Sequence, residues 1–121
     1  MAIGEQKPKI TFGKFQNIDM RVALVRGVQD ASGTRFPCKV LHLDLGPLGD
    51  RRSVGQFALI DDAELLGSKV VACINLGERE MGSHVSQALV LGTPHPDGPA
   101  DQAQAIPLRA HPLAEPGDAV F

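Results

Sequence analysis

The amino-acid sequence predicts an all-β domain, a five-stranded barrel with one short helix between the third and fourth strands. Three observations support this fold class. Short segments alternate apolar and polar residues with a period of two, turn residues separate these segments, and one stretch carries a helix-start pattern. A chain of 121 residues has the size of a single domain with one hydrophobic core.

The first two strands are predicted from alternation. The first covers residues 18–28, and its core-facing side is expected to hold Ile18, Met20, Val22, Leu24 and Val28. Turn residues at 30–34 follow it. The second strand covers residues 40–45, with Leu41, Leu43 and Leu45 expected to face inward.

The remaining elements follow in a regular order. Asp61 with Glu64 three residues later predicts a short capped helix. Strands are predicted at 53–59, 69–76 and 86–91, a loop at 94–99, and one extra strand at 104–109. Five strands with a helix between the third and fourth have the order of an OB-fold, a small Greek-key barrel.

Composition and cysteine usage narrow the class of protein. Apolar residues make up 43% of the chain and charged residues 21%, as in ordinary globular domains. The sequence has no apolar run of membrane-spanning length and no basic-then-apolar leader, so we expect a cytoplasmic protein. Cys38 is expected to be exposed and Cys73 buried, both as reduced thiols, because they lack disulfide-frame or zinc-site spacing.

Charge is distributed unevenly along the chain. The formal net charge is -2, which argues against a protein that coats nucleic acid by bulk attraction. Residues 1–60 nevertheless carry a net charge of +4 and residues 61–121 a net charge of -6. This asymmetry either places a basic face on an acidic body or reflects chance segregation of solvated side chains.

Two separated motifs resemble a known family. They are Phe15-Gln-Asn-Ile-Asp-Met-Arg-Val22 and the stretch Asn75-Leu-Gly-Glu-Arg-Glu-Met-Gly-Ser-His-Val-Ser86. Both resemble signatures of the tRNA-binding domain family, most closely the version in CsaA-type proteins. The resemblance extends over residues 10–92. One departure is Glu80, flanked by Glu78, where many family members carry Lys.

The resemblance implies an RNA-binding face. In an OB-fold the ligand meets strands two and three and two loops, which here are residues 30–38 and 77–85. Arg35 and Arg79 are expected to grip phosphate, and Phe36 to stack a base. The full expected RNA-binding set is Arg35, Phe36, Arg52, Gln56, Asn75, Arg79, Met81, His84 and Ser86.

Several of these residues have a structural alternative. Asn75 and Ser86 either read a base edge or a 2′-OH, or they bond loop backbone. Met81 is expected mainly as a packing residue, and Phe36 either stacks a base or covers the barrel end. The doublet at 51–52 contacts phosphate or forms a solvated strand end.

No enzymatic signal accompanies this pattern. The four histidines, at 42, 84, 95 and 111, show no ligand spacing, and no nucleophile-elbow or phosphate-loop motif occurs. We therefore expect no catalytic residues, no metal site and no cofactor. Two binding functions remain: a free-standing tRNA-binding module, or a CsaA-like export chaperone that binds unfolded or presecretory polypeptides.

The resemblance also implies a homodimer. The whole chain is expected to form one domain, with a barrel core at about 15–92 and terminal extensions at 1–14 and 93–121. Five apolar residues of the C-terminal extension either seal a two-fold interface or pack on their own barrel. They are Ile106, Leu108, Leu113, Val120 and Phe121.

Overall fold

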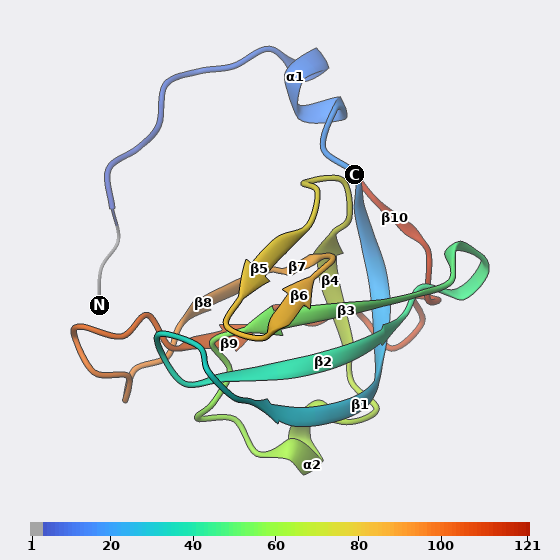
Figure 1. Ribbon diagram of the computed structural model, residues 1–121. Coiled ribbons are helices and arrows are strands. Elements are labelled where there is room, and N and C mark those ends of the chain that lie inside the picture. The colour runs from blue at the N-terminus through green and yellow to red at the C-terminus, as the bar shows by residue number, and fades with distance from the viewer. Residues whose placement is uncertain (1–3) are drawn as a thin grey trace.

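The computed structural model describes residues 4–121 and has the predicted all-β, barrel-like architecture (Figure 1). A curled antiparallel sheet contains, in spatial order, β3 (Asp50–Gly55), β2 (Cys38–Asp44), β1 (Met20–Ala31), β4 (Lys69–Cys73) and β7 (Leu89–Val90), and β10 (Ala119–Val120) also pairs with β1. Two small hairpins accompany it: β5 (Arg79–Met81) with β6 (His84–Ser86), and β8 (Gly92–Pro94) with β9 (Ala105–Pro107). The helices are α1 (Phe12–Gln16), α2 (Asp62–Leu65) and the 3-10 turn η1 (Gly46–Leu48).

Strand β1 joins the two halves of the sheet. Its residues 20–24 pair with β4, and its residues 24–31 pair with β2. The register with β2 shifts between Val25 and Gly27, which is a β-bulge. A bulge bends its strand and increases the local twist, so β1 can belong to both halves while the sheet curls.

The bulge also explains an error in the predicted core face of β1. The main core contains Ala23 and Val25, at odd-numbered positions. Of the predicted residues, Val22 is buried outside this cluster, Leu24 is only half-buried and Ile18 is exposed. Beyond the bulge Val28 packs against the same core. Both faces of this strand carry apolar residues, so alternation by itself did not distinguish the inner face.

The core prediction for β2 is confirmed. Leu41, Leu43 and Leu45 are almost completely buried and lie in one cluster with Leu65 of α2 and Val70 of β4. Burial of a side chain of this size stabilises the fold by about 1.5–3 kcal/mol. The alternating leucines therefore anchor the sheet against the helix and the opposite strand.

Helix α2 lies where the sequence predicted it, but its first turn is not stabilised by a capping box. Asp61 is its N-cap and makes no side-chain capping bond. Instead, the buried Lys39 of β2 places its Nζ 2.7 Å from a carboxylate oxygen of Asp62 and hydrogen-bonds to the Ile60 carbonyl. Lys39 thus ties the start of the helix to the sheet.

Other boundaries shift modestly. Strand β3 begins at Asp50 instead of 53, so the basic doublet lies within the strand. The predicted loop at 77–85 contains the β5–β6 hairpin, and the extra strand at 104–109 is present as β9. Helix α1, which the sequence did not predict, belongs to an N-terminal arm that extends away from the barrel (Figure 1). No helix within residues 4–121 is long and apolar enough to cross a bilayer.

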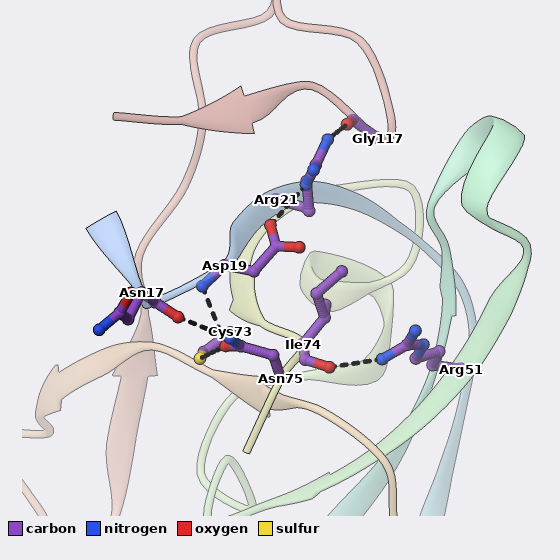
Figure 2. Close-up of polar contacts among 8 residues, drawn as sticks. All are labelled: Asn17, Asp19, Arg21, Arg51, Cys73, Ile74, Asn75 and Gly117. Atoms are coloured by element: carbon purple, nitrogen blue, oxygen red, sulfur yellow. Dashed lines mark hydrogen bonds and ion pairs between the residues drawn. The ribbon is translucent and has the colours of Figure 1, made fainter. Parts of the chain in front are cut away.

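The C-terminal residues pack along the start of β1. Arg21 bonds Asp19 at 2.7 Å and donates to the Gly117 carbonyl at 3.1 Å (Figure 2). Gly117 has φ +93°, and its Cα lies so close to the Leu45 carbonyl that a Cβ there would be 2.4 Å from the oxygen. A glycine is required at this contact because the backbone conformation and the space both exclude a side chain.

This close approach predicts that Gly117→Ala destabilises the domain more than Gly49→Ala. Gly49 has φ +85°, so a side chain there carries a similar backbone penalty. A Cβ at this position would have no heavy atom within 4 Å apart from its chain neighbours, so it would not clash. We expect Gly49→Ala to lower the free energy of unfolding by about 1 kcal/mol, and Gly117→Ala by at least about 1 kcal/mol more. Urea unfolding measures both, and equal losses would contradict the close packing.

Candidate nucleic-acid interface

A pocket of about 370 Å³ lies between the loop that joins β1 to β2 and the β5–β6 hairpin. We call it the loop pocket. It is lined by Thr34, Arg35, Phe36, Cys38, Gln56, Arg79, Glu80, Met81 and Gly82. Five residues of the expected RNA-binding set, Arg35, Phe36, Gln56, Arg79 and Met81, are therefore brought together from three separate parts of the chain.

The two loops that form this pocket touch each other. A Cβ on Gly82 would lie 2.3 Å from the carbonyl oxygen of Gly33, so the two backbones are in direct contact. Close by, the Ser32 N–H donates to Nε2 of His84 at 3.1 Å. His84, expected as an RNA contact, therefore links the loops and leaves its other ring nitrogen available.

The base of the pocket is apolar. Cys38, Val40 and Val54 form a second buried cluster, against which Met81 of the hairpin packs. Met81 therefore acts as the packing residue that the sequence suggested. The expectation of an exposed Cys38 is wrong: it is only 5% exposed because the hairpin covers this face of the sheet.

The environment of Cys38 suppresses its reactivity. Burial raises the pKa of the Cys38 thiol, and a hydrogen bond with Thr34 opposes this effect more weakly. A raised pKa favours the neutral thiol, which is a poor nucleophile. Cys38 therefore contributes apolar surface to the pocket.

The walls of the pocket carry cations that the protein does not neutralise. Arg35 and Arg79 are exposed, and in the described part of the chain neither has a carboxylate oxygen within 4.0 Å. The Arg35 guanidinium lies 5.2 Å from the centre of the Phe36 ring, at cation–π distance. This pair forms a layered, positively charged surface in the pocket that Gln56 also lines.

Asn75 lies outside this pocket, and its amide is occupied within the protein. Its Oδ1 accepts from the Asp19 N–H at 2.9 Å, and its Nδ2 donates to the Asn17 carbonyl at 2.7 Å (Figure 2). These bonds connect the end of β4 to the residues that precede β1. Of the two roles open to Asn75, the structure thus agrees with the backbone-bonding one.

Ser86 also has internal partners. It is 7% exposed, and its Oγ accepts from the Val54 N–H at 3.0 Å while donating to the Ala88 carbonyl at 3.0 Å. The neighbouring Gln87 N–H donates to the Arg52 carbonyl at 2.7 Å. Segment 86–88 therefore closes the barrel against β3.

A second hollow adjoins the loop pocket and shares Gln56, Arg79 and Met81 with it. We call this hollow, of about 250 Å³, the apolar groove. Its further lining includes Phe57, Leu76, Leu89, Ala103 and Ala105. Leu76 and Leu89 are both exposed, so the groove presents apolar side chains to solvent.

Arg52 lies in neither of these hollows. It lines a third one, of about 360 Å³, which we call the arginine pocket. The lining residues are Arg26, His42, Leu43, Asp50, Arg51, Arg52 and Gln87. Sequence reasoning missed Arg26. This residue reaches the arginine pocket because β1 and β3 both pair with β2, and the residues around Arg26 do not reveal that pairing.

Comparison with known protein sequences finds relatives that match part of their own length. No protein-family model matches the chain. Among curated proteins, the methionine–tRNA ligase of Chlorobium limicola is 34% identical over 94 residues, covering 76% of this chain but 13% of the ligase. The ligase of Chlorobaculum tepidum gives the same values. The chain thus corresponds to a small part of these relatives.

Solved structures match over nearly the whole chain. The CsaA chaperone protein from Picrophilus torridus has a TM-score of 0.79 and 26% identity, with 93% of this chain and 100% of that chain covered. The chain is of the CsaA type within the tRNA-binding domain family. Chaperone CsaA from Bacillus anthracis shares the fold, with a TM-score of 0.81, 23% identity, and 94% of this chain and 100% of that chain covered.

The apolar residues expected at a dimer interface divide into two groups in this CsaA-type domain. Ile106 packs against the main core, and Val120 pairs with Met20 inside the sheet. Leu108 is exposed, Leu113 is 83% exposed, and Phe121 is fully exposed. Only the second group remains free to meet a partner.

No group of three or more His, Cys, Asp or Glu side chains in residues 4–121 is arranged to hold a metal ion. The side chains that line the loop pocket include guanidinium, amide, carboxylate and aromatic groups. These groups bind anions, base edges and flat rings.

The hydrogen bonds of Ser86 predict that Ser86→Ala destabilises this CsaA-type domain. The change leaves the buried Val54 N–H without a partner, which costs about 1–3 kcal/mol. Ser83→Ala in the same hairpin is the matched control, since Ser83 is exposed and makes no side-chain hydrogen bond in the described structure. Thermal unfolding should separate the two variants, and equal midpoints would argue against closure by Ser86.

Proposed function

We propose that this domain is a non-catalytic RNA-binding module whose ligand is tRNA. The observation that carries the proposal is the loop pocket. It is lined by Phe36, by Gln56 and by two arginines, Arg35 and Arg79, that have no carboxylate partner among residues 4–121. Guanidinium groups bind phosphate, an aromatic ring stacks a splayed base, and an amide pairs with base edges. The similarity to methionine–tRNA ligases supports the same ligand class.

Glu80 moderates this attraction. It lines the same pocket and is exposed, so its negative charge lies close to the phosphate path. Its carboxylate can instead accept a hydrogen bond from a base amino group or a 2′-OH. Glu78 is less involved, because it accepts from Nε2 of Gln87 at 3.4 Å. The loop therefore selects for specific contacts over general attraction to polyanions.

A second candidate function is binding of unfolded polypeptide, as in a CsaA-like export chaperone. The apolar groove favours it, since exposed Leu76 and Leu89 border a hollow continuous with the loop pocket. Two solved neighbours are named as CsaA chaperones. An apolar groove binds through buried surface, and such binding responds weakly to salt.

The tRNA proposal predicts salt-dependent binding that weakens in Arg35→Ala and Arg79→Ala. Each variant should lose about tenfold or more in affinity for labelled bulk tRNA, since a hydrogen bond to a charged group contributes about 1.5–3 kcal/mol. The slope of log affinity against log salt should fall by about one for each arginine removed. Titration at several salt concentrations measures both quantities.

Arg109→Ala is the matched control for these variants. It removes the same charge from an exposed guanidinium that pairs with Glu64 at 3.4 Å, beside α2 and outside the loop pocket. Unchanged tRNA binding in both pocket variants would overturn the site assignment. Binding of a labelled unfolded polypeptide that persists in high salt, without any tRNA signal, would favour the chaperone function instead.

We further propose that the domain forms a homodimer. The exposed Leu113 and Phe121 support this, because large apolar side chains at the surface often meet a partner. Light scattering should give twice the mass of one chain, and Phe121→Ser should shift the equilibrium toward the monomer. A monomeric wild-type protein at micromolar concentration would contradict the proposal.

A further inference from the structure

The loop pocket and the apolar groove have one wall in common. Gln56, Arg79 and Met81 line both hollows. Gln56 directly follows β3, whereas Arg79 and Met81 are the first and last residues of β5. We call these three residues the shared wall. A ligand that fills either hollow therefore meets the same three side chains.

The shared wall is held in place from both ends of the hairpin. Met81 packs on the second buried cluster, and a Cβ on the adjacent Gly82 would lie 2.3 Å from the carbonyl oxygen of Gly33. At the end of β6, Ser86 bonds the backbone of Val54. A movement of the hairpin that widened one hollow would break these contacts. The wall thus has one position to offer to both ligands.

Arg79 is the member of the shared wall whose side chain suits both ligands, in different ways. It is exposed, and no carboxylate oxygen among residues 4–121 lies within 4.0 Å of it. Its guanidinium can donate to a phosphate in the loop pocket, while its methylene stem can pack on apolar groups in the groove. One side chain does not adopt both positions at once, so each ligand competes for it.

The two hollows also favour opposite surroundings. The apolar groove holds about 250 Å³ and is lined by Phe57, Leu76 and Leu89, among others, whereas the adjoining loop pocket holds about 370 Å³ and carries the unpaired arginines. An apolar chain in the groove would remove water from a phosphate held at the shared wall. Loss of water around a charged group is costly, so simultaneous binding is disfavoured even where space remains.

We propose that RNA and unfolded polypeptide bind this domain one at a time, and that RNA releases polypeptide from the apolar groove. This inference rests on the proposed tRNA-binding function and makes polypeptide binding a second state of the same site. Ionic strength then selects the occupant, because RNA binding weakens as salt rises whereas burial of apolar surface responds little to salt.

A competition titration tests the exclusion. Reduced and carboxyamidomethylated lactalbumin, which stays unfolded, is labelled, bound to the full chain at low salt and titrated with bulk tRNA. The anisotropy of the label should fall to that of the free polypeptide. The apparent Kd of tRNA should rise in proportion to polypeptide concentration without a plateau, because overlapping sites exclude each other completely. Separate sites with a finite coupling energy would give a plateau.

A plateau, or a complex that retains both ligands, would overturn the inference and leave the tRNA-binding function intact. Arg35→Ala gives a second test, since Arg35 lines the loop pocket and not the groove. This variant should need about tenfold more tRNA for half-displacement, the factor by which it weakens direct tRNA binding. Arg109→Ala should match wild type. Displacement of polypeptide from Arg35→Ala at the wild-type tRNA concentration would also overturn the inference.

A salt series separates the remaining outcomes. Raising the salt concentration with tRNA still present should return the polypeptide to the protein, and polypeptide that stays displaced would contradict the exclusion. Wild-type protein that binds tRNA but no lactalbumin would overturn the inference alone. Wild-type protein without salt-dependent tRNA binding would overturn the proposed function, and the inference with it.

Discussion

Residues 86–88 close the barrel against β3, and side chains supply most of the hydrogen bonds. Ser86 accepts from the Val54 N–H, and Ser53 donates to the Ala88 carbonyl at 2.8 Å. The side chain of Gln87 accepts from the Arg52 N–H, and the Gln87 N–H donates to the Arg52 carbonyl. Because this segment begins at Ser86, the last residue of β6, closure also positions the β5–β6 hairpin over the sheet. The hairpin then covers the second apolar cluster and lines the loop pocket and the apolar groove. The loop pocket and the arginine pocket both depend on this one contact region.

Contact between the two loops gives the loop pocket a defined shape before any ligand arrives. The backbones of Gly33 and Gly82 touch, and His84 accepts a hydrogen bond from Ser32. A pocket that is already formed loses less conformational entropy on binding than two separate loops would. The apolar base beneath it, with Met81 packed on the sheet, restricts the loops further. In the RNA-binding function that we propose, these contacts favour recognition of one splayed base over loose association with any polyanion.

The distribution of ion pairs explains how a chain with net charge -2 can present cationic sites. Several basic side chains are neutralised by structural partners, among them Arg21 by Asp19 and Arg26 by Asp44. Arg35, Arg52 and Arg79 are without such partners in the described structure and line the two pockets. Arg79 comes from the acidic half of the chain, so the charge asymmetry along the sequence does not by itself determine where the unpaired arginines lie. Pairing, more than net charge, decides where phosphate can bind.

The sequence by itself determined the features that depend on local pattern: the inward leucines of β2, the order of strands, and the two loops that carry Arg35 and Arg79. Alternation and turn chemistry act over a few residues, so they can be interpreted without a fold. Tertiary structure decided the burial of Cys38 and the inner face of β1, where a bulge changes the alternation. It also decided that the side-chain amide of Asn75 bonds the chain near β1 and that arginines of different strands share a pocket. Each of these depends on a partner distant in sequence, which only the folded chain brings within hydrogen-bonding or packing distance.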